Sequence, residues 1–228
     1  MNRDLQRWCA WTGVPSMVLF FIGMVVMTFI PPLSPALSAN EVASIYQNNT
    51  IGIRIGAVMI LISSMVAIPF YGAVSIQLRA MEGDKRPVAA YAQLAAGAAN
   101  IQFFILPALL FVVASFRPER SPELTSLLND LAWIITILPW PITGAQMLIC
   151  GVAILKHSTH SKVFPRWVGF LNLWLLLLMV PGSLIPFFKT GPFAWNGLLA
   201  FWIPATMFGV WFVVMQVMVL KAINREVD

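Results

Sequence analysis

The stretch GIRIGAVMILISSMVAIPFYGAVSIQL, from Gly52 to Leu78, contains a single charged residue, Arg54, which lies near its beginning. A helix that crosses the hydrocarbon core of a bilayer needs about 17–25 mostly apolar residues, at a rise of about 1.5 Å per residue. The stretch meets both requirements, and it predicts a membrane-spanning helix. It decides the fold because the rest of the chain contains further stretches of similar length and apolar composition.

Five other stretches are as apolar and nearly as long. Together with 52–78, the predicted spans lie near residues 14–31, 88–116, 131–155, 167–188 and 196–220. Of the 228 residues, 59% are hydrophobic and only 10% are charged, whereas soluble domains carry about 25% charged residues. The sequence therefore predicts an all-α, polytopic bundle of six transmembrane helices, which forms a single domain over residues 1–228.

The basic residues are divided unevenly between the two sides of this bundle. Six spans place both termini on one side, which then holds ten of the 14 Lys and Arg residues. These ten are Arg3, Arg7, Arg79, Lys85, Arg86, Lys156, Lys162, Arg166, Lys221 and Arg225, and the other four are Arg54, Arg117, Arg120 and Lys189. Loops rich in Lys and Arg face the cytoplasm. We therefore expect a multi-pass protein of the cell membrane with both termini cytoplasmic.

The N-terminal segment has a second interpretation. A basic start, an apolar run and the stretch PPLSPALSAN together are similar to a secretory signal peptide with its cleavage site. The apolar run from Val14 to Ile30 is longer than the core of about 7–15 residues that signal peptides have. We therefore expect an uncleaved first span.

Two segments on the outer side carry signals for the start of a helix. Ser38-Ala39-Asn40-Glu41 matches the capping box, and Ser121-Pro122-Glu123 places a capping Ser before a Pro in the first helical position. An apolar stripe follows the second signal at Leu124, Leu127, Leu128 and Leu131. We predict two short amphipathic outer helices, which either rest on the membrane interface or cover a cavity between the spans.

Prolines interrupt five of the six spans. They are Pro69, Pro107, Pro139 with Pro141, Pro181 with Pro186, and Pro204. A kink frees backbone carbonyl groups, which neighbouring side chains or a cavity must then accommodate. So many interrupted helices favour a bundle with internal space, whereas Gly52-x-x-x-Gly56 indicates close helix packing at the start of the second span.

Neutral polar residues are the first candidates for a site inside the bundle. No Asp, Glu, Lys, Arg or His lies near the centre of any predicted span, which argues against a proton-coupled transporter or a charged ion filter. Gln93, Asn100 and Gln146 either form hydrogen bonds between helices or orient the polar group of a lipophilic ligand. Arg54 is a further candidate for binding such a ligand. Trp195 and Trp202 either pack and contact lipid or form the wall of a flat apolar site.

The charged candidates lie at the outer rim. Arg54 with Asp130 or Glu41 predicts a structural ion pair; alternatively, Asp130 or Glu41 is a catalytic acid at the mouth of an apolar cavity. Lys189 lies near Trp195 and Trp202, where a lysine reaches lipid phosphates and tryptophans form the interfacial belt.

Other chemistries lack their motifs. The sequence contains no P-loop, GxGxxG, GxSxG or HExxH motif. His157 and His160 form a His-x-x-His pair without neighbouring Cys, Asp or Glu partners, and no basic stripe with interleaved aromatic residues is present. We expect no metal, no cofactor and no nucleic-acid partner.

Two short motifs resemble a known family. Ile53-Arg54-Ile55-Gly56 forms an Arg-x-Gly-like turn into the second span, and Pro165-Arg166-Trp167-Val168-Gly169 opens the fifth. The chain thereby resembles an uncharacterised family of bacterial membrane proteins with six spans and about this length. The resemblance implies the six-span fold and the bacterial inner membrane, and it implies no particular activity.

Three functions fit these observations. The first is a membrane protein that holds a lipophilic molecule, such as a lipid, steroid, quinone or terpenoid, in an outward-opening cavity for uptake, transfer or sensing. The second is a structural or accessory subunit, with a copy of itself or another membrane protein as its partner. The third is an intramembrane isomerase or a terpene-cyclase-like enzyme that uses a carboxylate at the rim. Membrane lipids are partners in all three.

Overall fold

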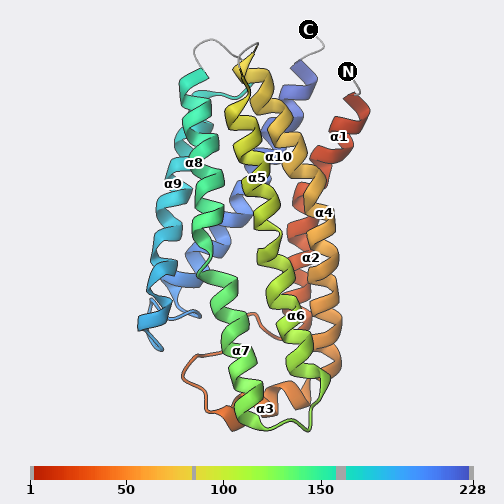
Figure 1. The fold of residues 1–228 in the computed structure, drawn as a ribbon, viewed down its shortest axis with the longest axis vertical. Coiled ribbons are helices and arrows are strands. Elements are labelled where there is room, and N and C mark those ends of the chain that lie inside the picture. Colours follow the sequence, from red (N-terminus) through yellow and green to blue (C-terminus); the bar gives the residue numbers. More distant parts are fainter. Residues whose placement is uncertain (1–2, 84–85, 158–162, 226–228) are drawn as a thin grey trace.

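The computed structural model describes residues 3–83, 86–157 and 163–225, and every regular element within them is a helix. Lys85, His160 and Lys162 lie outside the described residues. The described helices long and apolar enough to cross a membrane are Arg3–Val26, Thr50–Glu82, Val88–Phe116, Pro122–His157, Arg166–Phe187 and Leu198–Arg225. These confirm the predicted all-α bundle of six spans. Both ends of the chain lie at the same end of the bundle (Figure 1).

The first span begins earlier and ends earlier than predicted. It consists of α1 (Arg3–Trp11) and α2 (Gly13–Val26), so residues 27–31 are not helical. Met27 and Phe29 nevertheless have no exposed surface. The apolar run continues past the helix because its last part packs into the core as a loop, and the prediction took this part for helix.

The second and third spans differ in continuity. α4 (Thr50–Glu82) runs through Pro69 without a break. The third span is divided at Ile101 into α5 (Val88–Asn100) and α6 (Gln102–Phe116).

The fourth span includes the segment that was predicted to form the second outer helix. α7 (Pro122–Ile137) starts at Pro122, as predicted, but it is longer than a rim helix and continues after a break into α8 (Trp140–His157). Its leucine stripe faces outward, since Leu124 and Leu127 are more than half exposed, whereas Asn129 is buried. This polarity suits a helix in lipid, where apolar side chains are the natural outer surface.

The last two spans each contain an irregular segment. The fifth consists of α9 (Arg166–Met179) and the 3₁₀ helix η1 (Val180–Phe187). The sixth begins with the π-helix η2 (Leu198–Trp202) and continues as α10 (Ile203–Arg225).

The first predicted outer helix is α3 (Ala39–Asn48), which lies at the end of the bundle opposite the termini (Figure 1). The capping box is formed as expected: the Glu41 carboxylate accepts hydrogen bonds from the Ser38 backbone N–H (2.8 Å) and hydroxyl (2.7 Å). Tyr46 joins α3 to the fourth span by donating its hydroxyl hydrogen to Asn129 Oδ1 (3.1 Å).

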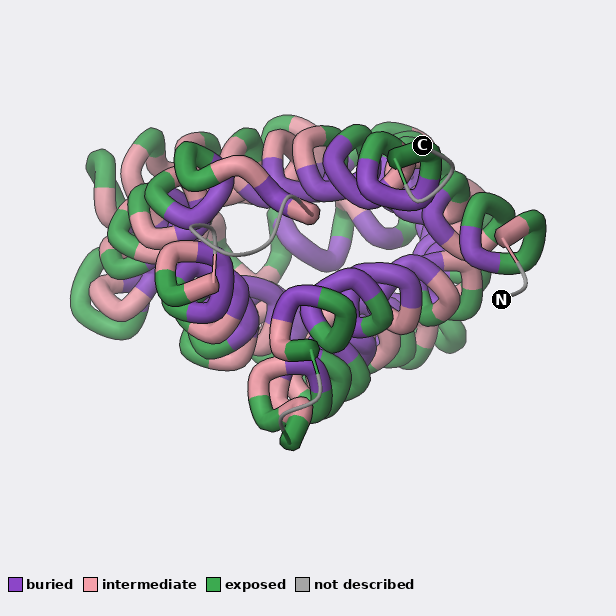
Figure 2. The backbone as a smooth tube through the Cα atoms, turned by 90° about the horizontal axis from the view of Figure 1, so that it is seen from above, coloured by how far each residue is buried: buried purple, intermediate pink, exposed green. Residues whose placement is uncertain are grey.

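Two pairs of glycines let neighbouring helices approach closely. A Cβ added to Gly23 in α2 would lie 2.7 Å from the carbonyl oxygen of Gly56 in α4. A Cβ added to Gly151 in α8 would lie 3.1 Å from the carbonyl oxygen of Gly169 in α9. Gly56 therefore has the packing role that its spacing predicted. Buried segments face the interior of the bundle and exposed ones face outward (Figure 2).

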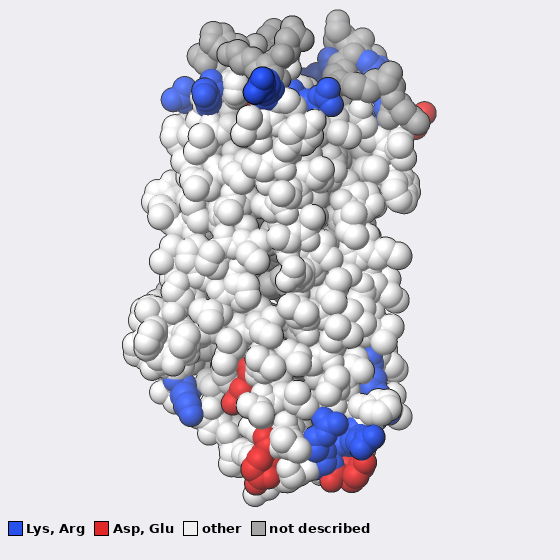
Figure 3. All heavy atoms as spheres, in the orientation of Figure 1, with Lys and Arg blue, Asp and Glu red and all other residues white. Residues whose placement is uncertain are grey.

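The charged residues lie at the two ends of the molecule. A row of Lys and Arg follows the end that carries the termini, the middle is a broad uncharged band, and the opposite end carries both signs (Figure 3). This distribution fits a bundle whose middle lies in hydrocarbon.

Candidate functional site

The predicted polar candidates form hydrogen bonds between spans. Asn100 in α5 donates from Nδ2 to Gln146 Oε1 in α8 (2.5 Å), and Thr143 Oγ1 donates to Asn100 Oδ1 (2.9 Å). Gln93 accepts a hydrogen bond from the Ser75 hydroxyl in α4. All of these side chains are buried. This is the interhelical role that the sequence allowed for them.

Arg54 does not form the predicted ion pair. Its guanidinium donates to the carbonyl oxygens of Ser115 (2.7 Å) and Phe116 (3.1 Å), the last residues of α6, rather than to Asp130 or Glu41. A helix ends with carbonyl groups that lack an intrahelical partner, and a cation there also complements the helix dipole. Arg54 therefore caps α6 at the rim of the bundle.

The two candidate acids lie at the outer end. The pKa of the exposed Glu41 carboxyl lies below its ordinary value. The main cause is the hydrogen bond that Glu41 accepts from the Ser38 hydroxyl, and the second is the one from the Ser38 backbone N–H. Asp130 accepts a hydrogen bond from its neighbour Asn129 (3.4 Å). Because its hydrogen bonds go to Ser38, Glu41 is a capping residue of α3.

Tyr46 of α3 lies close to Asp130. Burial, with a smaller contribution from Asp130, raises the pKa of Tyr46 well above its ordinary value.

The two tryptophans have different surroundings. Trp195 is 6% exposed and donates from Nε1 to the carbonyl oxygen of Leu33 (2.7 Å), so its side chain packs within the protein. It ties the segment before the sixth span to the loop that follows the first. Trp202 is 38% exposed and packs edge-on against Phe201.

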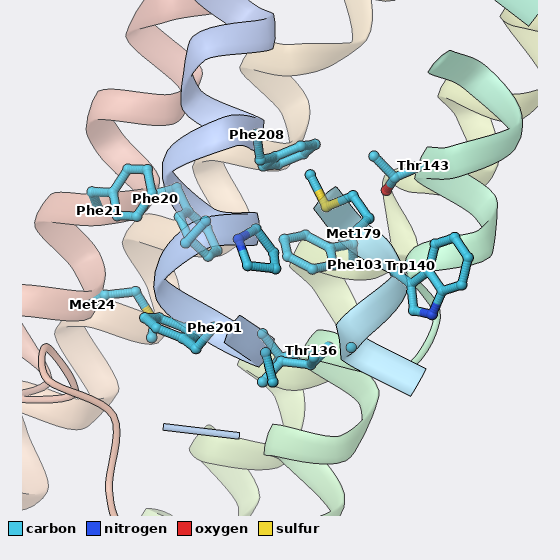
Figure 4. Close-up of a pocket in the computed structure, with 15 residues that line it drawn as sticks. Phe20, Phe21, Met24, Phe103, Thr136, Trp140, Thr143, Met179, Phe201 and Phe208 are labelled. Atoms are coloured by element: carbon cyan, nitrogen blue, oxygen red, sulfur yellow. The ribbon is translucent and has the colours of Figure 1, made fainter. Parts of the chain in front are cut away.

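An apolar cavity lies between five of the six spans (Figure 4). Its 15 lining residues are Phe20, Phe21 and Met24 of α2, Phe103 of α6, Thr136 and Ile137 of α7, Trp140 and Thr143 of α8, Met179 of α9, Gly182 of η1, Ala200 and Phe201 of η2, and Pro204, Ala205 and Phe208 of α10. We call this space the central cavity. Its volume is about 60 Å³.

The central cavity lies where four spans are interrupted. Ile137 and Trp140 flank the break between α7 and α8, and Met179 and Gly182 flank the change from α9 to η1. Phe201 and Pro204 flank the change from η2 to α10, and Phe103 lies just after the break at Ile101. Irregular backbone cannot pack as tightly as regular helix, and short π-helical segments are frequent at functional sites. The breaks therefore account for the cavity.

The lining provides almost no polar group. Only two of its members carry a hydroxyl, and both hydrogens are already used: Thr136 donates to the Ala132 carbonyl (2.7 Å) and Thr143 donates to Asn100. Trp140 donates to the Ser183 hydroxyl (2.8 Å), which fixes the ring between the fourth and fifth spans. None of the lining residues is ionisable. The wall can hold hydrocarbon, and it contains no group for acid–base chemistry.

The cavity is bordered by residues that are partly exposed. They are Phe21 of α2, Phe103 of α6, Trp140 of α8, and Pro204 and Ala205 of α10. The remaining wall is almost entirely buried.

The sequence-predicted binding residues do not line the central cavity. Asn100 lines a smaller neighbouring pocket of about 40 Å³, and Thr143 belongs to both spaces. Arg54, Gln93, Gln146, Trp195 and Trp202 lie elsewhere. Seven of the 15 lining residues are Phe or Met, which are abundant throughout this chain and therefore gave no signal by residue type alone. The prolines were the usable signal, since three of the four interrupted spans carry one near the cavity.

No family model, curated protein or solved structure matches this chain. Among the described residues, no group of three or more His, Cys, Asp and Glu side chains could hold a metal ion. The candidate site is therefore defined by its geometry alone.

Proposed function

We propose that this integral membrane protein holds the hydrocarbon chain of a lipophilic molecule in the central cavity. The observation that carries the proposal is a wall of apolar side chains from five spans, at the level where four of them are interrupted. Apolar walls with few polar groups are typical of small-molecule sites. An unfilled space of this kind does not stabilise a folded protein, because interiors are otherwise closely packed.

The size of the cavity favours a chain over a ring system. Its volume of about 60 Å³ is below the volume of about 150 Å³ at which an engineered protein cavity binds benzene. A steroid or a quinone ring does not fit the cavity in this form. An acyl or isoprenoid chain can insert its end past the partly exposed edges, while its polar part stays at the membrane surface.

We propose that the protein serves uptake, transfer or sensing of such a molecule in the bacterial inner membrane, with both termini cytoplasmic. The orientation is supported by the row of basic residues at the end that carries the termini. The bacterial membrane is supported by the Arg-x-Gly and Pro-Arg-Trp-x-Gly motifs.

The test is a comparison of two leucine substitutions on α10. Ala205→Leu fills the central cavity, whereas Gly209→Leu places the same side chain one turn further on, where an added Cβ meets no atom within 4 Å. Each protein is purified in mild detergent and weighed by native mass spectrometry, and bound apolar molecules are extracted and identified.

We expect the wild type and Gly209→Leu to carry a chain-bearing lipophile and Ala205→Leu to lose at least about nine-tenths of it. Such a loss corresponds to about 1.4 kcal/mol of binding free energy, the size expected when a few methylene contacts are removed. Equal retention by all three proteins would contradict the proposal. So would a wild type that carries no apolar molecule.

A further inference from the structure

We propose a second site, which binds an anionic glycerophospholipid at the end of the bundle that carries the termini. A groove lies there between α5 and α8, with a volume of about 370 Å³. We call it the terminal groove. A pocket that shares Glu82, Val88, Lys156 and His157 with it adds Arg86 to its mouth. The lining contains both cationic and apolar side chains, which is the composition that an anionic amphiphile requires.

The α8 wall of the groove changes from apolar to basic along one helix face. Ile149, Val152, Ala153 and Lys156 follow one another at helical spacing, and all four line the groove. Lys156 lies nearest the end of the bundle, and the three apolar residues lie deeper. A lipid that places its phosphate at Lys156 therefore has an apolar surface beneath it for its acyl chain.

The α5 wall repeats this arrangement. Val88, Ala89 and Ala92 provide its apolar part, and Arg86 precedes the helix at the mouth. The small side chains of Ala89 and Ala92 leave room between α5 and α8. The two walls thus place one basic residue each above an apolar floor.

The acidic residue of the groove is engaged by the protein. Glu82, at the end of α4, accepts hydrogen bonds from the backbone N–H groups of Ala89 (2.9 Å) and Ala90 (3.0 Å). These are unpaired donors of the first turn of α5, where a carboxylate also complements the helix dipole. Glu82 therefore serves as the cap of α5, and among the described residues that line the mouth, Arg86 and Lys156 carry the positive charge for a ligand.

The groove closes toward the middle of the membrane. The Asn100–Gln146 hydrogen bond (2.5 Å) joins α5 and α8 below the groove and holds them together there. Basic pockets between membrane helices on the cytoplasmic side are typical sites for anionic phospholipid headgroups. A free phosphate would contact only the basic residues at the mouth, whereas a phospholipid would also contact the apolar walls. We therefore assign the groove to a phospholipid.

The charge test uses two double variants that remove the same charge from the same end. The double variant Arg86→Gln, Lys156→Gln removes the two positive charges at the mouth of the groove. The control, Arg7→Gln with Lys221→Gln, removes the charges of two exposed basic residues outside the groove. Binding of phosphatidylglycerol and phosphatidylcholine is titrated by native mass spectrometry. We expect the mouth variant to lose about tenfold in phosphatidylglycerol affinity and the control less than about twofold. Equal losses would overturn the proposal.

The chain test separates a phospholipid from a free anion. Ala92→Phe fills the groove without a change in charge, and Ala95→Phe adds the same ring on an exposed position of α5. We expect only Ala92→Phe to weaken phosphatidylglycerol binding, and we expect glycerol phosphate not to compete. Competition by glycerol phosphate, together with no effect of Ala92→Phe, would reduce the site to an anion site and contradict our assignment.

Discussion

The central cavity and the terminal groove are both spaces between membrane helices, yet they differ in every property that selects a ligand. The cavity is enclosed by five spans, has no ionisable residue in its wall and measures about 60 Å³. The groove is formed mainly by two helices, combines basic with apolar residues and measures about 370 Å³. One space suits the end of a hydrocarbon chain, and the other suits an entire anionic amphiphile.

The difference shows what recognition means inside a bilayer. Lipid tails surround the protein on all sides, so an apolar wall alone gives no preference over bulk membrane, and the cavity must select by shape. The groove lies where headgroups meet water, and there charge discriminates between lipids. Substitutions in the lining of one site should therefore leave the other site occupied.

The largest expected effect comes from separating α2 from α4. Gly23→Val places a side chain against the Gly56 carbonyl, and we expect a loss of about 3 kcal/mol in unfolding free energy, the upper end of the cost of overpacking. Because α2 carries Phe20 and Met24 of the cavity wall, the cavity should lose its ligand while the groove keeps its own. Unfolding in detergent and native mass spectrometry measure the two effects.

Gly72→Val is the matched control for this prediction. Gly72 lies in α4, and a Cβ added there meets nothing within 4 Å. The substitution should leave stability and both occupancies unchanged. If Gly23→Val empties the groove as well as the cavity, the prediction that α2 supports only the cavity is wrong.

A smaller effect is expected for Asn100→Leu. The change removes the donor to the side-chain oxygen of Gln146 and the acceptor of the Thr143 hydroxyl. We expect a cost of about 1–2 kcal/mol in unfolding free energy. Asn100 holds the base of the groove through Gln146 and contacts the cavity wall through Thr143, so both occupancies should fall. Gln102→Leu, on an exposed position two residues away, is the control. Unchanged occupancy in Asn100→Leu would contradict this link between the sites.

The smallest effect is expected for Glu41→Gln at the outer end. The pKa of Glu41 in the folded protein lies below its ordinary value of 4.5. Its contribution to stability is therefore complete above about pH 4.5 and is lost as the pH falls through the folded pKa. The melting temperature of the wild type should exceed that of Glu41→Gln at pH 6, and the difference should shrink below pH 4.

Glu41→Gln should leave both sites occupied at pH 7, because α3 lines neither. Loss of the cavity ligand in this variant would instead support the alternative in which the outer helix covers the cavity.

The sequence predicted the six spans because length and composition are enough to define a membrane helix. It also predicted the Ser38–Glu41 capping box, since that motif is local. It failed for Arg54, whose partners are the backbone carbonyls of Ser115 and Phe116, because the sequence does not show which helix end will lie beside a side chain. The position and lining of the central cavity were beyond prediction for the same reason. They depend on where breaks in four helices coincide, and Pro139, Pro181 and Pro204 indicate breaks without showing that they meet.

The most direct test of the central claim is photolabelling by a phospholipid that carries a diazirine at the end of one acyl chain. After irradiation in membranes, the labelled residues are mapped by peptide mass spectrometry. We predict label on Met24 and Met179, which are 2% and 4% exposed, as well as on residues at the outer surface such as Met65, which is 64% exposed. Ala205→Leu should remove the first two labels and keep the third. Label confined to residues such as Met65 would contradict the proposed function, because no chain would then enter the central cavity.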